Sequence, residues 1–175
     1  MQNLKVGSTL QGGRYKITSI LGQGGFGITY LAIQSGVERK VAVKEFFMKE
    51  LCERDETTSH VTIGTEGSRE TVNRFREKFL KEARHIAKFN HPNIVRVIDV
   101  FDENATSYYV MDFVEGESLS ARLKRTGKPM SEAELMLVIP QILEALECVH
   151  AEGIWHLDLK PANIMIDKKG NVQLI

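Results

Sequence analysis

Apolar and polar residues alternate along short segments of the chain, and this alternation predicts β-strands. The first segments are rich in glycine and β-branched residues, and turn residues separate them. The pattern predicts five strands, over residues 15–21, 28–33, 41–44, 94–101 and 107–114. We expect these strands to form an antiparallel sheet, because turns join the first three directly.

Apolar residues recur with helical spacing in two other segments. The first predicts a helix over about residues 69–89. The second begins at Ser131, which forms a capping box with Glu134, and runs to His150. Pro140 lies inside this second segment, so it should kink the helix or mark a later start.

The order of these elements divides the chain into two parts. Residues 1–115 hold the five strands and one helix, whereas residues 116–175 are mainly helical and end in a hairpin over residues 164–175. Residues 52–68 show no period and predict a loop or an insertion. The fold class expected from this order is α+β.

Composition narrows the possible functions. The 175 residues are 42% hydrophobic and 26% charged, which is typical of a globular domain. The formal net charge is zero, so nothing favours a nucleic-acid partner. No apolar run reaches the roughly 18 residues of a membrane helix. Cys52 and Cys148 are too few for a disulfide framework, which favours a reducing, cytoplasmic location.

A glycine-rich turn joins the first two predicted strands. Gly22, Gly24 and Gly27 lie in the sequence GQGGFG. Glycine lets backbone amides approach phosphate oxygens closely, because no Cβ intervenes. Since the turn joins strand to strand, it favours a flap over a nucleotide rather than a dinucleotide-binding loop, which joins strand to helix. A plain glycine-rich hairpin turn is the alternative.

A cation and an anion are predicted to meet beside this turn. Lys44 ends the apolar strand Val41-Ala42-Val43, and Glu82 shares a helix face with the apolar positions 75, 79 and 86. An unpaired carboxylate in such a stripe would cost roughly several kcal/mol, so we expect Glu82 to pair with Lys44. The alternatives are a solvated strand lysine, and a helix rolled so that Glu82 lies at its margin, exposed or paired with Lys78.

A third cluster lies in the segment HLDLKPAN, residues 156–163. Asp158 could accept a proton from an attacking hydroxyl group. Lys160 could neutralise charge on a phosphoryl group, and Asn163 could hold a divalent metal through its carbonyl oxygen. The alternative is a polar turn in which Asp158 and Asn163 cap backbone amides.

Taken in order along the chain, these motifs resemble those of the protein kinase family, and in particular the bacterial serine/threonine kinases. The resemblance spans about residues 15–175. It implies ATP and Mg²⁺ as cofactors and a protein serine or threonine hydroxyl as the phosphoryl acceptor. It also implies that the glycines cover the phosphates, that Lys44 binds the α- and β-phosphates, that Asp158 is the catalytic base and that Asn163 binds Mg²⁺.

The same resemblance implies an adenine site and a boundary between two lobes. The small, ATP-binding lobe with its hinge would cover residues 1–115, and residues 116–175 would begin a mainly helical large lobe. The residues implied around adenine are Thr29, Ala42, Met111, Asp112, Val114 and Met165. Of these, Met111 would be the gatekeeper, and Asp112 and Val114 would belong to the hinge.

Three departures from the family pattern change the expectation. Thr29 stands where the family usually has valine, and Leu157 replaces the usual arginine before the catalytic aspartate, which suggests another route of control. The sequence ends at Ile175, just before the expected Asp-Phe-Gly motif. The resemblance therefore implies an incomplete catalytic domain that is inactive alone and prone to self-association. A non-catalytic nucleotide-binding or interaction module is the alternative.

Overall fold

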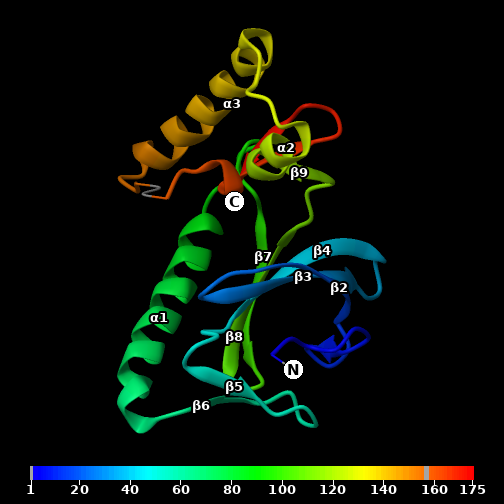
Figure 1. Cartoon of the computed structure of the whole chain (residues 1–175), viewed down its shortest axis with the longest axis vertical. Helices are drawn as coiled ribbons and strands as arrows, with labels where there is room; N and C mark the ends of the chain where they lie inside the picture. Colours follow the sequence, from blue (N-terminus) through cyan, green and yellow to red (C-terminus); the bar gives the residue numbers. More distant parts are fainter. Residues whose placement is uncertain (1, 156–157) are drawn as a thin grey trace. The chain divides into compact units, whose positions relative to one another are not determined.

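The computed structural model describes residues 2–155 and 158–175 and divides them into two compact units. The first unit contains the residues up to Ala87 together with Val97–Phe113, and the second contains Lys88–Arg96 and Val114–Ile175. Figure 1 shows the elements of each unit along the chain.

An antiparallel sheet of six strands forms the centre of the first unit. In spatial order the strands are β1 (Thr9–Leu10), β2 (Tyr15–Gln23), β3 (Gly27–Gln34), β4 (Arg39–Phe46), β8 (Thr106–Asp112) and β7 (Val97–Glu103). The five predicted strands are confirmed, and the two-residue β1 is added at one edge.

The strand predicted over residues 94–101 begins three residues late, at Val97. Ile94 forms a bridge with Leu174, and the Val95 amide donates to the Leu174 carbonyl at 2.8 Å. These residues therefore pair within the second unit, a long-range contact that the local pattern does not contain.

Helix α1 (Arg69–Ile86) packs on the sheet of the first unit through Val72, Phe79 and Ala83, which are buried. The Phe79 ring lies 4.9 Å from the Tyr109 ring, centroid to centroid. Phe75 and Ile86 are only half-buried, so the predicted apolar stripe is rotated toward Val72 and Ala83. This rotation decides the exposure of Glu82.

The segment predicted as a loop or an insertion over residues 52–68 contains a hairpin, so the loop interpretation was wrong. Its strands are β5 (Cys52–Arg54) and β6 (Val61–Ile63), and a 3₁₀ turn, η1 (Glu66–Ser68), leads into α1. Cys52 and Val61 are buried, but the main anchor is the Arg54 guanidinium, whose Nη2 lies 2.6 Å from Glu45 Oε1. Because an ion pair between charged side chains anchors the hairpin, apolar periodicity does not reveal it.

The second unit consists of a small antiparallel sheet and helices. Its elements are β9 (Gly116–Ser118), α2 (Leu119–Thr126), α3 (Glu132–Ala151), η2 (Pro161–Asn163), β10 (Ile164–Asp167) and β11 (Val172–Leu174). The sheet order is β11-β10-β9, which confirms the terminal hairpin and adds β9. Gly116 is required there, because a Cβ at this position would lie 1.9 Å from the Ile166 carbonyl oxygen.

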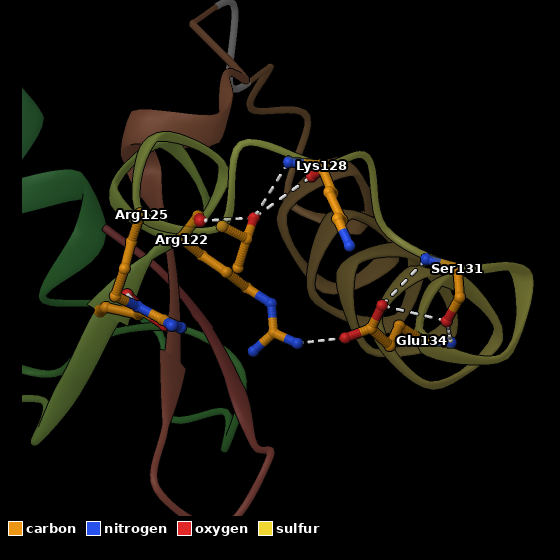
Figure 2. A network of polar contacts seen from close by, with 7 residues as sticks. Arg122, Arg125, Lys128, Ser131 and Glu134 are labelled. Atoms are coloured by element: carbon orange, nitrogen blue, oxygen red, sulfur yellow. Dashed lines mark hydrogen bonds and ion pairs between the residues drawn. The ribbon is translucent and has the colours of Figure 1, made fainter.

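The predicted capping box at the start of α3 is confirmed: Ser131 and Glu134 bond each other's backbone amides. Figure 2 shows that Arg122 of α2 also pairs with Glu134, so one carboxylate joins the two helices. Because α3 begins at Glu132, Pro140 lies within it and does not delay its start. Of the helices in the described ranges, none is long and apolar enough to cross a membrane.

Candidate functional site

The glycine-rich turn between β2 and β3 is closed by its own backbone. The Gly24 amide donates to the Gly27 carbonyl at 2.9 Å. A Cβ on Gly27 would lie 2.7 Å from the Glu45 carbonyl oxygen, so packing against β4 requires glycine here. A Cβ on Gly22 would meet no atom within 4 Å. Glycine at position 27 is therefore required for packing of the fold. At position 22 the space beside the backbone is open, so a ligand could approach it.

The predicted ion pair between β4 and α1 is confirmed. Lys44 Nζ lies 3.7 Å from Glu82 Oε1. The predicted core position of Glu82 was wrong: 55% of its side chain is exposed, compared with 32% for Lys44. The reason is the rotation of α1, which buries Phe79 and Ala83 and leaves Glu82 at the margin of the packed face.

Tyr109, a residue that the sequence analysis missed, forms part of this pair's surroundings. It stands opposite Lys44 in the β4–β8 register and is buried. Lys44 Nζ lies 5.4 Å from the Tyr109 ring centroid and 6.0 Å from that of Phe79. The alternation of strand 107–114 could have identified Tyr109, because residues directly opposite each other on adjacent strands face the same side of the sheet, here Tyr109 and Lys44.

The electrostatic environment keeps the lysine charged. Burial opposes the charge of the Lys44 ammonium, but the Tyr109 hydroxyl and the Glu82 carboxylate outweigh it, so the pKa of Lys44 is raised. Burial likewise raises the pKa of Tyr109. At neutral pH the first unit thus presents one fixed cation between β4 and α1, close to the glycine-rich turn.

The residues expected around adenine in the first unit lie on adjacent strands. Ala42 pairs with Met111 across β4 and β8, and both are buried. Thr29 stands opposite Lys44 across β3 and β4 and is half-buried. Asp112 ends β8, where its Oδ1 lies 3.5 Å from Arg39 Nη1. Together with the glycines, Lys44 and Glu82, these residues belong to one compact unit.

The second unit holds the remaining predicted residues, including Val114 and Met165. The Val114 carbonyl accepts a hydrogen bond from the Gly116 amide at 2.9 Å. Met165 on β10 pairs with Ser118 of β9 and Gln173 of β11, and its side chain is half-buried.

Asp158, Lys160 and Asn163 form a connected polar cluster. Lys160 Nζ lies 2.8 Å from Asp158 Oδ2, and Asn163 Nδ2 donates to the same oxygen at 2.9 Å. Asn163 Nδ2 also donates to the Asp158 carbonyl at 3.0 Å. His156 and Leu157, which open this segment, lie outside the described residues.

The cluster offers the expected metal one oxygen donor. Because the Asn163 amide nitrogen bonds Asp158, the Asn163 carbonyl oxygen is the atom of that side chain suited to a hard cation. The Ile175 amide donates to the Asn163 backbone carbonyl at 3.0 Å, which ties η2 to the end of β11. The cluster therefore supplies one amide oxygen to a divalent metal, and the described residues contain no group of three or more His, Cys, Asp or Glu side chains that could hold one.

Comparisons with known proteins show the family to which the chain belongs. A family model for the protein kinase domain matches residues 15–175. Serine/threonine-protein kinase PksC of Streptomyces coelicolor is 34% identical over 99% of this chain and 29% of its own length. Serine/threonine-protein kinase PknA of Mycobacterium tuberculosis is 35% identical over 97% of this chain and 36% of its own length.

Solved structures share the fold. The structure of the apo form of PpkA-294 matches with a TM-score of 0.94 and 28% identity, covering all of this chain and 61% of that chain. The kinase domain of Mycobacterium tuberculosis PknI matches with a TM-score of 0.73 over 98% of this chain and 60% of that chain, at 22% identity, and supports the fold alone.

The chain therefore belongs to the protein kinase family, and the two curated relatives described above are bacterial serine/threonine-protein kinases. It spans about a third or less of the length of these two relatives.

Proposed function

We propose that this chain supplies the ATP-binding and catalytic-loop residues of a kinase that phosphorylates protein serine or threonine hydroxyls. The observation that carries the proposal is the pair of polar clusters, one in each unit: Lys44 with Glu82 beside the glycine-rich turn, and Asp158 with Lys160 and Asn163. Family membership adds independent support.

In the first unit, the backbone amides of the glycine-rich turn would cover the ATP phosphates, and Lys44 would bind the α- and β-phosphates. Glu82 would orient Lys44, since its carboxylate lies 3.7 Å from Nζ. Ala42 and Met111, with Met165 of the second unit, would contact adenine, and Thr29 would lie over it. The backbone of residues 112–114 would form the hinge. Bound Mg²⁺-ATP would supply the phosphoryl group.

In the second unit, Asp158 would accept the proton of the attacking hydroxyl. Lys160 and Asn163 both contact its carboxylate and would hold it in place. Lys160 would also balance charge on the phosphoryl group, and Asn163 would bind one Mg²⁺ through its carbonyl oxygen. We further propose a lobe boundary between residues 115 and 116 and a cytoplasmic location.

We propose that residues 1–175 alone have negligible phosphotransfer activity, because they span only 61% of the PpkA-294 chain. The test is an assay with radiolabelled ATP and a generic basic protein as acceptor. Robust turnover that the Asp158→Asn variant abolishes would overturn the proposed inactivity and support kinase chemistry. Nucleotide binding that needs Lys44, without turnover, fits both this proposal and a non-catalytic module. A longer form of the protein that contains this chain and also lacks turnover would favour the module.

We also propose that residues 1–175 alone self-associate through α3. Met136, Leu137 and Leu143 on this helix are 67%, 70% and 59% exposed, respectively. Such a cluster favours association, because covering it removes apolar surface from water. Sedimentation velocity should show concentration-dependent dimers, and the Met136→Lys/Leu143→Lys variant should be monomeric. A wild-type chain that stays monomeric at high concentration would contradict this.

A further inference from the structure

A cavity of about 360 Å³ lies in the first unit, and none of its lining residues is proposed above to bind ATP. It is bordered by the β5–β6 hairpin, the first turns of α1 and the turn between β7 and β8, all at the same end of this unit (Figure 1). Its volume falls within the roughly 300–1,000 Å³ range of small-molecule sites.

The walls of this cavity are fixed by buried polar bonds. Arg54 of β5 lies 2.6 Å from Glu45, and their side chains are 2% and 0% exposed. The Val61 amide of β6 donates to the Asn104 carbonyl in the β7–β8 turn at 2.8 Å. Because these bonds join the hairpin both to β4 and to the β7–β8 turn, the cavity is preformed and does not depend on a loose loop.

The floor and the rim of the cavity differ in chemistry. Cys52, Val61 and Val72 provide an apolar floor, and each is less than a tenth exposed. The rim carries the cations Arg69 and Arg76, and none of the described lining residues is a carboxylate.

The two rim arginines differ in what they already bind. Arg76 donates to Asp102 at 2.9 Å and to Ser107 at 2.6 Å, which fixes its position. Arg69 is exposed and has no ion pair within the described part of the chain. A positive rim above an apolar floor is complementary to a ligand with an apolar body and one anionic group.

We propose that this cavity binds a small organic anion, whose apolar body lies on Val61 and Val72 and whose carboxylate or phosphate faces Arg69. Such a ligand would contact the first turns of α1 and the hairpin at once, and would therefore brace the start of α1. Glu82 lies on the same helix, so occupancy would stabilise the helix that carries the carboxylate partner of Lys44.

The test is a titration of the ¹⁵N-labelled chain with 3-phenylpropionate, followed by the amide spectrum. We expect saturable shifts at residues 61–63 and 69–76. The neutral amide of the same acid, 3-phenylpropanamide, should bind at least fivefold more weakly, because it lacks the negative charge that would face Arg69. A phosphate monoester of phenylethanol, tested in parallel, shows which anionic group the site prefers.

Matched variants locate the site. Arg69→Gln should weaken binding at least fivefold, whereas Arg74→Gln, which removes the same charge from the same helix outside the cavity lining, should not. Thr62→Trp should block binding from the exposed side of β6. Well-dispersed spectra establish that each variant is folded. The proposal would be overturned if the folded wild type showed no saturable shifts. It would also be overturned if Arg69→Gln bound 3-phenylpropionate as tightly as the wild type does, and the wild type bound the neutral amide as tightly as the acid.

Discussion

Strand β4 carries two neighbouring charges whose surroundings are opposite. Glu45 is completely buried and accepts hydrogen bonds from Tyr30 at 2.7 Å and Tyr108 at 2.6 Å, with Arg54 also at 2.6 Å. Lys44, one residue earlier, is partly exposed and lies 3.7 Å from a carboxylate that is itself half exposed. Successive residues of a strand face opposite sides of the sheet, which separates these environments.

The difference teaches which charge maintains the fold and which is available for chemistry. A buried charge must be paired, because desolvation otherwise costs several kcal/mol, and a pair that is closed off from solvent cannot be reached by a ligand. A partly exposed pair contributes little to stability, yet its ammonium can still bind an anion. We therefore assign Glu45 with Arg54 to the fold, and Lys44 with Glu82 to ligand binding.

The largest expected effect comes from breaking the buried pair. Arg54→Ala leaves the Glu45 carboxylate buried without its cation and should lower the free energy of unfolding by about 3–5 kcal/mol. Urea denaturation followed by circular dichroism measures this loss. The double variant Glu45→Gln/Arg54→Met removes both charges and keeps an acceptor for the tyrosines, so it should lose less than the single variant. A loss below about 1 kcal/mol in Arg54→Ala would contradict the structural assignment.

A smaller effect is expected at the glycine-rich turn, where Gly27 contacts the backbone of Glu45. Gly27→Ala places a Cβ 2.7 Å from the Glu45 carbonyl oxygen and should cost about 1–3 kcal/mol of stability. Gly22→Ala, where a Cβ meets no atom within 4 Å, should change stability by less than about 0.5 kcal/mol. Thermal melts of the two variants under identical conditions compare them, and equal losses would refute the distinction between these glycines.

Neutralising Glu82, the exposed partner of Lys44, should change stability much less than removing the buried Arg54 charge. Glu82→Gln should shift the free energy of unfolding by under about 1 kcal/mol, because the carboxylate is 55% exposed. Denaturant titration of Glu82→Gln beside Arg54→Ala makes the comparison direct. If Glu82→Gln lowered the free energy of unfolding as much as Arg54→Ala does, both ion pairs would have to be assigned to maintaining the fold.

The pH dependence of the Lys44 contribution should be smaller still. The folded-state pKa of Lys44 is raised above its ordinary value of 10.5, so its stabilisation is complete below that value and is lost only as pH rises through the folded-state pKa. The difference in melting temperature between wild type and Lys44→Met should therefore be constant between pH 6 and 9. A difference that shrinks across this window would show that another group controls the pair.

Local pattern was sufficient for part of this architecture. Alternation predicted the strands that hold Ala42 and Met111, and helical spacing with charge pairing predicted that Glu82 meets Lys44. The roll of α1 could not be read in this way, because it depends on how Val72 and Phe79 pack against the sheet. The exposure of Glu82 follows from that roll.

Tertiary contacts explain the remaining errors. The β5–β6 hairpin depends on Arg54 reaching Glu45, and the late start of β7 depends on Ile94 and Val95 pairing with Leu174. The bonds that join Asp158 to Asn163 are local in sequence, yet which side-chain atom of Asn163 faces Asp158 becomes visible only in the structure.

The most direct test of the central claim measures stability and nucleotide affinity on the same variant. Lys44→Met should melt within about 2 °C of the wild type, because the pair is partly exposed, while its affinity for Mg²⁺-ADP by isothermal titration calorimetry falls at least tenfold, about 1.4 kcal/mol. Unchanged affinity, or a collapse in stability like that expected for Arg54→Ala, would contradict the assignment of Lys44 to ligand binding.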